Sequence, residues 1–100
     1  MSTHAYFFNL FEVAPEQERT LLTLLRTGIA TTISQRPGFV SGQILESSDR
    51  TRVVVAVVWE TAEAARATQH DPAVAETVRQ AATIARAQPG IFSLVEAFEL

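Results

Sequence analysis

The chain has 100 residues, the size of one domain spanning residues 1–100, and its 47% apolar content is ample for a packed core. The net charge is −3 and the arginines are scattered, which argues against nucleic acid as a partner. The absence of cysteine excludes disulfides and thiolate metal sites. No signal peptide is recognisable, and no apolar run approaches the roughly 20 residues of a membrane span, so we expect a soluble cytoplasmic protein without membrane contact.

The first half of the chain predicts a strand, a helix and a second strand. Aromatic and branched residues predict the first strand over Tyr6–Val13. Pro15 suits the first turn of a helix, and apolar residues then recur at helical spacing until residues 37–38, where Pro-Gly ends the helix. The second strand is expected over Phe39–Glu46, with Gly42 at a bulge.

The second half predicts a hairpin, a broken helix and a last strand. Turn-forming residues precede a third strand over Arg52–Trp59, which therefore returns beside the second strand. Thr61 suits the N-cap of an Ala-rich helix that is interrupted at residues 70–72 and continues to about Ala87. At the interruption Asp71 can cap the second part of the helix and Pro72 can begin it. Pro-Gly then ends this helix, and residues 91–100 form the last strand.

A weak internal repeat supports this order of elements. The segment Arg36–Val40 recurs in kind as Gln88–Phe92, and each copy is expected to end a helix and begin a strand. The sequence therefore predicts an α+β fold with ferredoxin-like βαββαβ order: a four-stranded antiparallel sheet with two helices on one face.

The strands are apolar on both faces, which predicts a homodimer. In the third strand Val53, Val55 and Val57 point one way, whereas Val54 and Val58 point the other. Two helices cover only one face of a sheet, so the second face is expected to pack against a copy of itself in a dimeric α+β barrel. The alternatives are that the helices wrap further around the sheet or that a different protein covers the second face.

Asn9 and Trp59 are the most informative polar side chains. Asn9 lies between Phe7 and Phe11 on one face of the first strand, where a buried unpaired amide costs about 1–3 kcal/mol. Its amide either satisfies a bulge or a backbone group, or it points into a ligand cavity. Trp59 is either a core residue or an N–H donor to a ligand. The alternation within each strand does not decide whether the two residues share a face.

Other motifs of catalysis or metal binding are missing. The two histidines lack the spacing of a metal site, the glycines form no phosphate-binding loop, and no Ser/His/Asp set is present. His70 is a candidate base if the helix break lies beside the cavity, and otherwise a solvated flank. Arg66, Arg79 and Arg86 are expected on the second helix and in contact with solvent, with pairing of one of them to an anionic substrate as the alternative. We expect no metal.

Three stretches together resemble the antibiotic biosynthesis monooxygenase family of dimeric α+β barrel proteins. They are Phe8–Val13, Arg36–Val40 and Val57–Thr61, the last followed by an Ala-rich helix and Asp-Pro at residues 71–72. Within the family the chain is most similar to the small cofactor-independent oxygenases that convert anthrone-type polyketides to quinones. In several of those an asparagine on the first strand and a tryptophan closing the third strand are implicated in catalysis.

The resemblance implies catalytic roles for Asn9 and Trp59, no cofactor, and a homodimer that acts on a small aromatic substrate and dioxygen. We expect the residues that bind the substrate on the first and third strands, the strands of Asn9 and Trp59: Phe7, Phe11, Val55 and Val57. Some members carry a second asparagine where this chain has Val55. The alternative to a monooxygenase is therefore a non-catalytic dimeric ligand-binding or accessory protein of the same fold.

Overall fold

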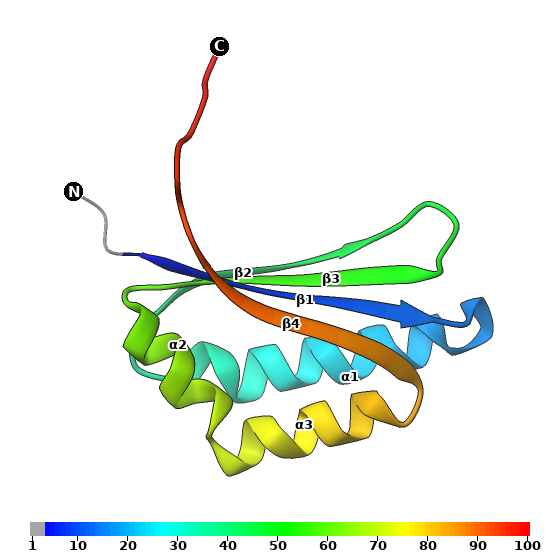
Figure 1. Ribbon diagram of the computed structural model, residues 1–100. Helices are drawn as coiled ribbons and strands as arrows, with labels where there is room; N and C mark the ends of the chain where they lie inside the picture. Colours follow the sequence, from blue (N-terminus) through cyan, green and yellow to red (C-terminus); the bar gives the residue numbers. More distant parts are fainter. Residues whose placement is uncertain (1–3) are drawn as a thin grey trace.

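Four strands form one antiparallel sheet in the computed structural model, which describes residues 4–100. In the sheet the strands follow the order β2-β3-β1-β4 (Figure 1). Their bounds are β1, Ala5–Val13; β2, Phe39–Glu46; β3, Arg52–Trp59; and β4, Ala85–Ser93. The expected ferredoxin-like α+β plan is confirmed, and the predicted bounds of the second and third strands match those of β2 and β3.

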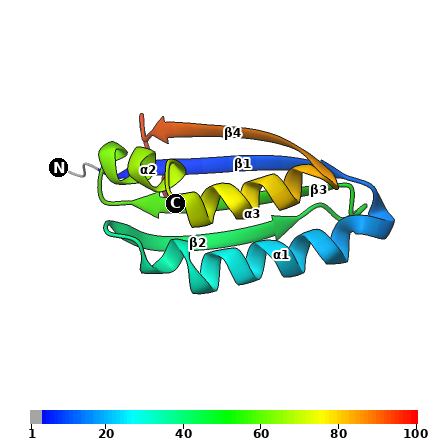
Figure 2. The same cartoon turned by 90° about the horizontal axis from the view of Figure 1, so that it is seen from below.

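The helices lie on one face of the sheet (Figures 1 and 2). They are α1, Glu18–Thr31; α2, Ala62–Gln69; and α3, Pro72–Ala82, with short 3-10 turns at Pro15–Gln17 and Ile33–Gln35 flanking α1. The Thr61 side chain accepts a hydrogen bond from the Ala64 N–H at the start of α2. Asp71 accepts from the N–H groups of residues 73 and 74 at the start of α3. The predicted caps and the helix break are thus present.

The end of the chain differs from the prediction. The last helix ends at Ala82 rather than near Ala87, and the last strand covers residues 85–93 rather than 91–100. Pro89 and Gly90, expected to separate helix from strand, lie inside β4 opposite residues 9 and 8 of β1. A proline is tolerated there because β4 is an edge strand, where the missing N–H does not interrupt pairing on both sides. The expected repeat of a helix-ending Pro-Gly is therefore wrong in its second copy.

The bulge in β2 is also displaced from its predicted place. The pairing of β2 with β3 shifts register between Phe39 and Ser41, so the bulge lies at Val40 instead of Gly42. Gly42 pairs regularly with Val57.

The two faces of the sheet have different surroundings. The helix-covered face carries Phe11, Val53, Val55 and Val57, which pack with core residues from the helices: Leu21, Leu25, Ala65 and Ala81. On the opposite face no helix of the described chain is packed, and residues 94–100 leave β4 on that side (Figure 1). None of the helices in residues 4–100 is long and apolar enough to span a membrane.

Candidate functional site

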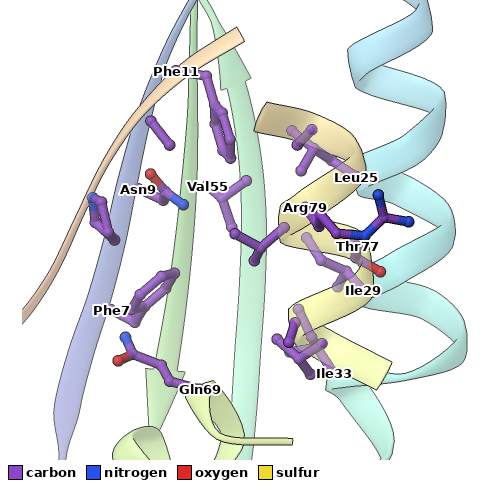
Figure 3. A pocket seen from close by; sticks show the side chains of 16 residues that line it. Phe7, Asn9, Phe11, Leu25, Ile29, Ile33, Val55, Gln69, Thr77 and Arg79 are labelled. Carbon is purple, nitrogen blue, oxygen red and sulfur yellow. The ribbon is translucent and has the colours of Figure 1, made fainter. Parts of the chain in front are cut away.

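A cavity of about 400 Å³ lies between the helix-covered face of the sheet and the helices (Figure 3). Its lining is mostly apolar, with contributions from β1, β3, β4, α1 and α3. The apolar side chains that line it on the sheet and on α1 are Phe7, Phe11, Val55, Ala87, Pro89, Leu25 and Ile29, with Ile33 just beyond α1. A cavity of this size and character suits a small, largely apolar ligand.

Asn9 supplies a polar group to the sheet side of this cavity. It lies between Val55 of β3 and Pro89 of β4 in the same row of the sheet, so both neighbours are apolar. The residue is only 4% exposed, and its Oδ1 is buried without a hydrogen-bond partner. Figure 3 shows the carboxamide projecting from β1 toward the helices. A buried acceptor without a partner costs about 1–3 kcal/mol, a cost that a ligand donating to Oδ1 would remove.

Three further polar side chains line the cavity, Thr77 and Arg79 from α3 and Gln69 from α2, and Figure 3 shows Gln69 close to Phe7. The Thr77 hydroxyl donates to the carbonyl oxygen of Ala73 at 3.4 Å, within its own helix. Gln69 is the last residue of α2, directly before the helix break. The cavity therefore has one polar group on the sheet and several on the helices, and the remaining lining is apolar.

Arg79 lies on the helix side of the cavity, away from Asn9 (Figure 3). Its Nε donates to Oε2 of Glu76 at 2.9 Å and its Nη2 donates to Oε1 at 2.6 Å. This hydrogen bonding raises the pKa of the Arg79 guanidinium and, mainly for the same reason, lowers the pKa of the Glu76 carboxyl. The Arg79 side chain is 68% exposed, as expected for a solvated residue of this helix, and it also contributes to the cavity wall.

Trp59 and Val57 share the helix-covered face with Asn9 but do not line the cavity. Trp59 pairs with Ala5, four residues along β1 from Asn9, which is about 13 Å in a strand. Its ring packs edge-to-face on Phe39 with the centroids 5.8 Å apart, and the residue is 2% exposed. Val57 pairs with Phe7 of β1, beside it on the same face of the sheet. Of the six site residues predicted from sequence, the structure brings four together around the cavity: Phe7, Asn9, Phe11 and Val55.

Sequence reasoning missed the helix residues of the site. Gln69, Thr77 and Arg79 are polar residues of an Ala-rich segment, and only the packing of α2 and α3 in the fold shows which of them face the cavity. His70, weighed as a base, is exposed and is not among the residues that line it. No Asp, Glu or His lines the cavity in the part of the chain that the structure describes.

Comparison with solved structures supports the fold. SnoaB from Streptomyces nogalater, a cofactor-independent oxygenase, is 23% identical with a TM-score of 0.78, covering 96% of this chain and 97% of that one. The monooxygenase ActVA-Orf6 of Streptomyces coelicolor, solved with the ligand nanaomycin D, is 24% identical with a TM-score of 0.84, covering 98% and 93%. Rv0793 from Mycobacterium tuberculosis is 16% identical with a TM-score of 0.81, covering 96% and 99%.

No curated protein sequence matches the chain. The family model described as antibiotic biosynthesis monooxygenase matches residues 6–80, from β1 into α3, and so includes the strands and helices that supply most of the cavity lining. The chain belongs to the antibiotic biosynthesis monooxygenase family.

Proposed function

We propose that this protein is a cofactor-independent monooxygenase that oxidises a planar, anthrone-like aromatic substrate with dioxygen to a quinone. The observation that carries the proposal is the buried, unpartnered Oδ1 of Asn9 beside an apolar cavity of about 400 Å³. Family membership supports monooxygenase chemistry, and the complex of ActVA-Orf6 with nanaomycin D supports an aromatic ligand.

The reaction needs little from the protein because the substrate supplies the electrons. An anthrone loses a proton to give an electron-rich phenolate, which passes one electron to dioxygen. The radical pair then combines at carbon to form a peroxide. Loss of water from the peroxide leaves a carbonyl, so the carbon loses two hydrogen atoms and gains one oxygen atom, and the second oxygen atom leaves as water.

Asn9 is the residue to which we assign the polar contact with substrate. Its amide N–H can donate to the phenolate or the peroxide, and its Oδ1 can accept from a substrate hydroxyl. In an apolar cavity such a bond is stronger than in water. Because no carboxylate or histidine of the described chain lines the cavity, deprotonation relies on the acidity of the substrate.

Phe7, Phe11 and Val55 form the apolar surface against which a flat substrate would lie. To Trp59, for which the family resemblance implies catalysis, we assign a positioning role instead. The Trp59 ring packs edge-to-face on Phe39 of β2 at the end of the sheet, and Val57, two residues before Trp59 on the same face of β3, pairs with Phe7 at the cavity.

A homodimer is part of the proposal because the second face of the sheet is apolar. Phe8 is 39% exposed and Phe92 is 54% exposed. Their rings pack edge-to-face on this face, with the ring centroids 5.5 Å apart. Leu94, Val95 and Phe98 in the segment beyond β4 are also exposed. A second copy of the chain would cover this face with the same surface.

A second candidate function is binding without turnover. The observation that favours it is Val55, directly opposite Asn9, where some family members carry a second asparagine. With only one amide at this point of the sheet, the cavity could hold an aromatic ligand without activating it. Such a protein would bind the substrate and leave the rate of oxygen uptake unchanged.

The test is oxygen uptake with an anthrone and no added cofactor, combined with the stability of Asn9→Leu. This variant keeps a similar volume and removes the unpaired acceptor. We expect the rate to fall at least about tenfold, while the free energy of unfolding stays the same or rises by about 1 kcal/mol. Gln35→Ala removes an exposed amide outside the cavity and is the matched control. An unchanged rate in Asn9→Leu, or a large loss of stability, would contradict the assignment.

A further inference from the structure

Gly28 is a glycine inside a helix, and it stands where α1 meets α3. It is buried in α1, and its carbonyl oxygen accepts the N–H of Thr32 at 3.1 Å, so its backbone is helical. Glycine weakens a helix interior relative to alanine. Its backbone angles need no glycine, because its φ is not positive. The reason for glycine at this position must therefore be space.

The missing side chain lets the two helices approach closely. A Cβ atom at position 28 would lie 2.8 Å from Cγ2 of Thr77 and 3.2 Å from its Oγ1. Side-chain carbons do not approach each other this closely, so alanine at this position requires a shift, which we expect to be a movement of α3 away from α1. Rotation of the Thr77 side chain away from the new Cβ would also give up the 3.4 Å hydrogen bond from its hydroxyl to the carbonyl oxygen of Ala73.

The same contact lies in the wall of the cavity. Thr77 lines the cavity, as does Ile29, the residue next to Gly28 (Figure 3). Further along the same two helices the lining includes Leu25 of α1 and Ala81 of α3. The distance between α1 and α3 therefore sets the width of the cavity on the side that faces Asn9.

From this geometry we infer that Gly28 determines the size of ligand that the cavity accepts. By holding α3 against α1, it keeps the cavity narrow enough for a three-ring aromatic ligand. A larger residue at position 28 would separate the helices, loosen the fit of that ligand and admit a four-ring ligand. This inference rests on the proposed function for the class of ligand, but it concerns binding and not turnover.

The experiment compares dissociation constants for two unreactive probes, a three-ring hydroxyanthraquinone and a four-ring hydroxytetracenequinone. In Gly28→Ala we expect the ratio of the two constants to shift about tenfold toward the larger probe, as one added carbon does at a fitted pocket. Thr77→Ser removes the Cγ2 atom that the new Cβ would meet. The double variant Gly28→Ala/Thr77→Ser should therefore return the ratio to within about twofold of the wild type.

General destabilisation by Gly28→Ala would not be reversed by Thr77→Ser. A ratio of dissociation constants that returns to the wild-type value in the double variant therefore points to the steric contact. A folded Gly28→Ala variant with the wild-type ratio would overturn the inference, and so would a double variant that behaves like Gly28→Ala. Unfolding of Gly28→Ala together with a folded double variant would support the steric contact.

Crystal structures of the variants keep the inference separate from the proposed function. We expect a larger cavity in Gly28→Ala and the wild-type volume in the double variant, whether or not any probe binds. If the cavity changes as expected but anthrone is not oxidised, the proposed function fails alone. If anthrone is oxidised and the cavity volume is the same in all variants, the size inference fails alone.

Discussion

The two faces of the sheet are built from similar residues but differ in what covers them. Phe11 on the helix-covered face is 2% exposed, whereas Phe92 on the opposite face is 54% exposed. The helix-covered face encloses the cavity and the one buried asparagine, and the opposite face offers apolar side chains to solvent. The position of the helices, and not the composition of the strands, therefore decides which face of this sheet can hold a ligand.

The largest expected effect comes from truncating an aromatic ring on the covered face. Phe11→Ala removes one of the largest fully buried side chains, and we expect the free energy of unfolding to fall by about 3–5 kcal/mol. Urea denaturation followed by circular dichroism measures the change. Phe92→Ala is the matched truncation on the opposite face and should cost clearly less. Equal losses from the two truncations would break the comparison between the faces.

A charge on the opposite face should affect association more than folding. Phe8→Asp places a carboxylate at the proposed dimer interface, and we expect the dimer to dissociate at least about 100-fold more readily. Sedimentation equilibrium measures the dissociation constant. Thr23→Asp adds the same charge on an exposed part of α1 and should leave association unchanged. A wild-type protein that stays monomeric at micromolar concentration would refute the dimer itself.

The smallest effect concerns a charged cluster where α1 meets the β2–β3 hairpin. Nε of Arg50 donates to Oε1 of the buried Glu18 at 3.2 Å. Hydrogen bonding between the Glu18 and Glu46 carboxyls raises the pKa of Glu46 and lowers that of Glu18. In the unfolded chain Glu46 has a pKa of about 4.5. Its contribution to stability is therefore fully present below that pH and is lost as the pH rises through the raised pKa of the folded state. The contribution of Glu18 has the opposite sign and is lost as the pH falls through its lowered pKa.

Glu46→Gln should reduce this pH dependence, because the amide remains a donor to Glu18 at every pH. We expect the midpoint of thermal unfolding to fall less in the variant than in the wild type between about pH 4.5 and neutrality. Circular dichroism at a series of pH values measures it. Glu63→Gln, on the exposed side of α2, is the matched control and should retain the wild-type profile. Parallel profiles for Glu46→Gln and the wild type would contradict the shared hydrogen bond.

Local signals in the sequence predict β2 and β3, and both helix caps, because each depends on neighbouring residues. The prediction of the last strand is wrong because Pro89 and Gly90 are strong breakers in isolation, whereas their effect depends on whether the strand lies at an edge. Edge position is a property of the whole sheet. It follows from the strand order and cannot be derived from the residues around position 89.

The residues of the candidate site also differ in whether the neighbouring sequence or only the whole fold reveals their position. Asn9 is identifiable from sequence because an asparagine between two phenylalanines of a strand is chemically unexpected. The placement of Trp59 away from the cavity depends on register and on Phe39, which comes from a different strand. Thr77 faces the cavity only because α3 lies close to α1, and that approach depends on Gly28.

Pro89 also has a consequence for how the chain avoids aggregation. The outer edge of a sheet is a template to which strands of other molecules can add without limit, and this chain also carries exposed apolar residues just beyond β4. At the middle of that edge, Pro89 has no N–H to offer to an incoming strand. The addition of further strands at the edge of β4 is therefore disfavoured. Self-association is then expected through the apolar face of the sheet that no helix covers.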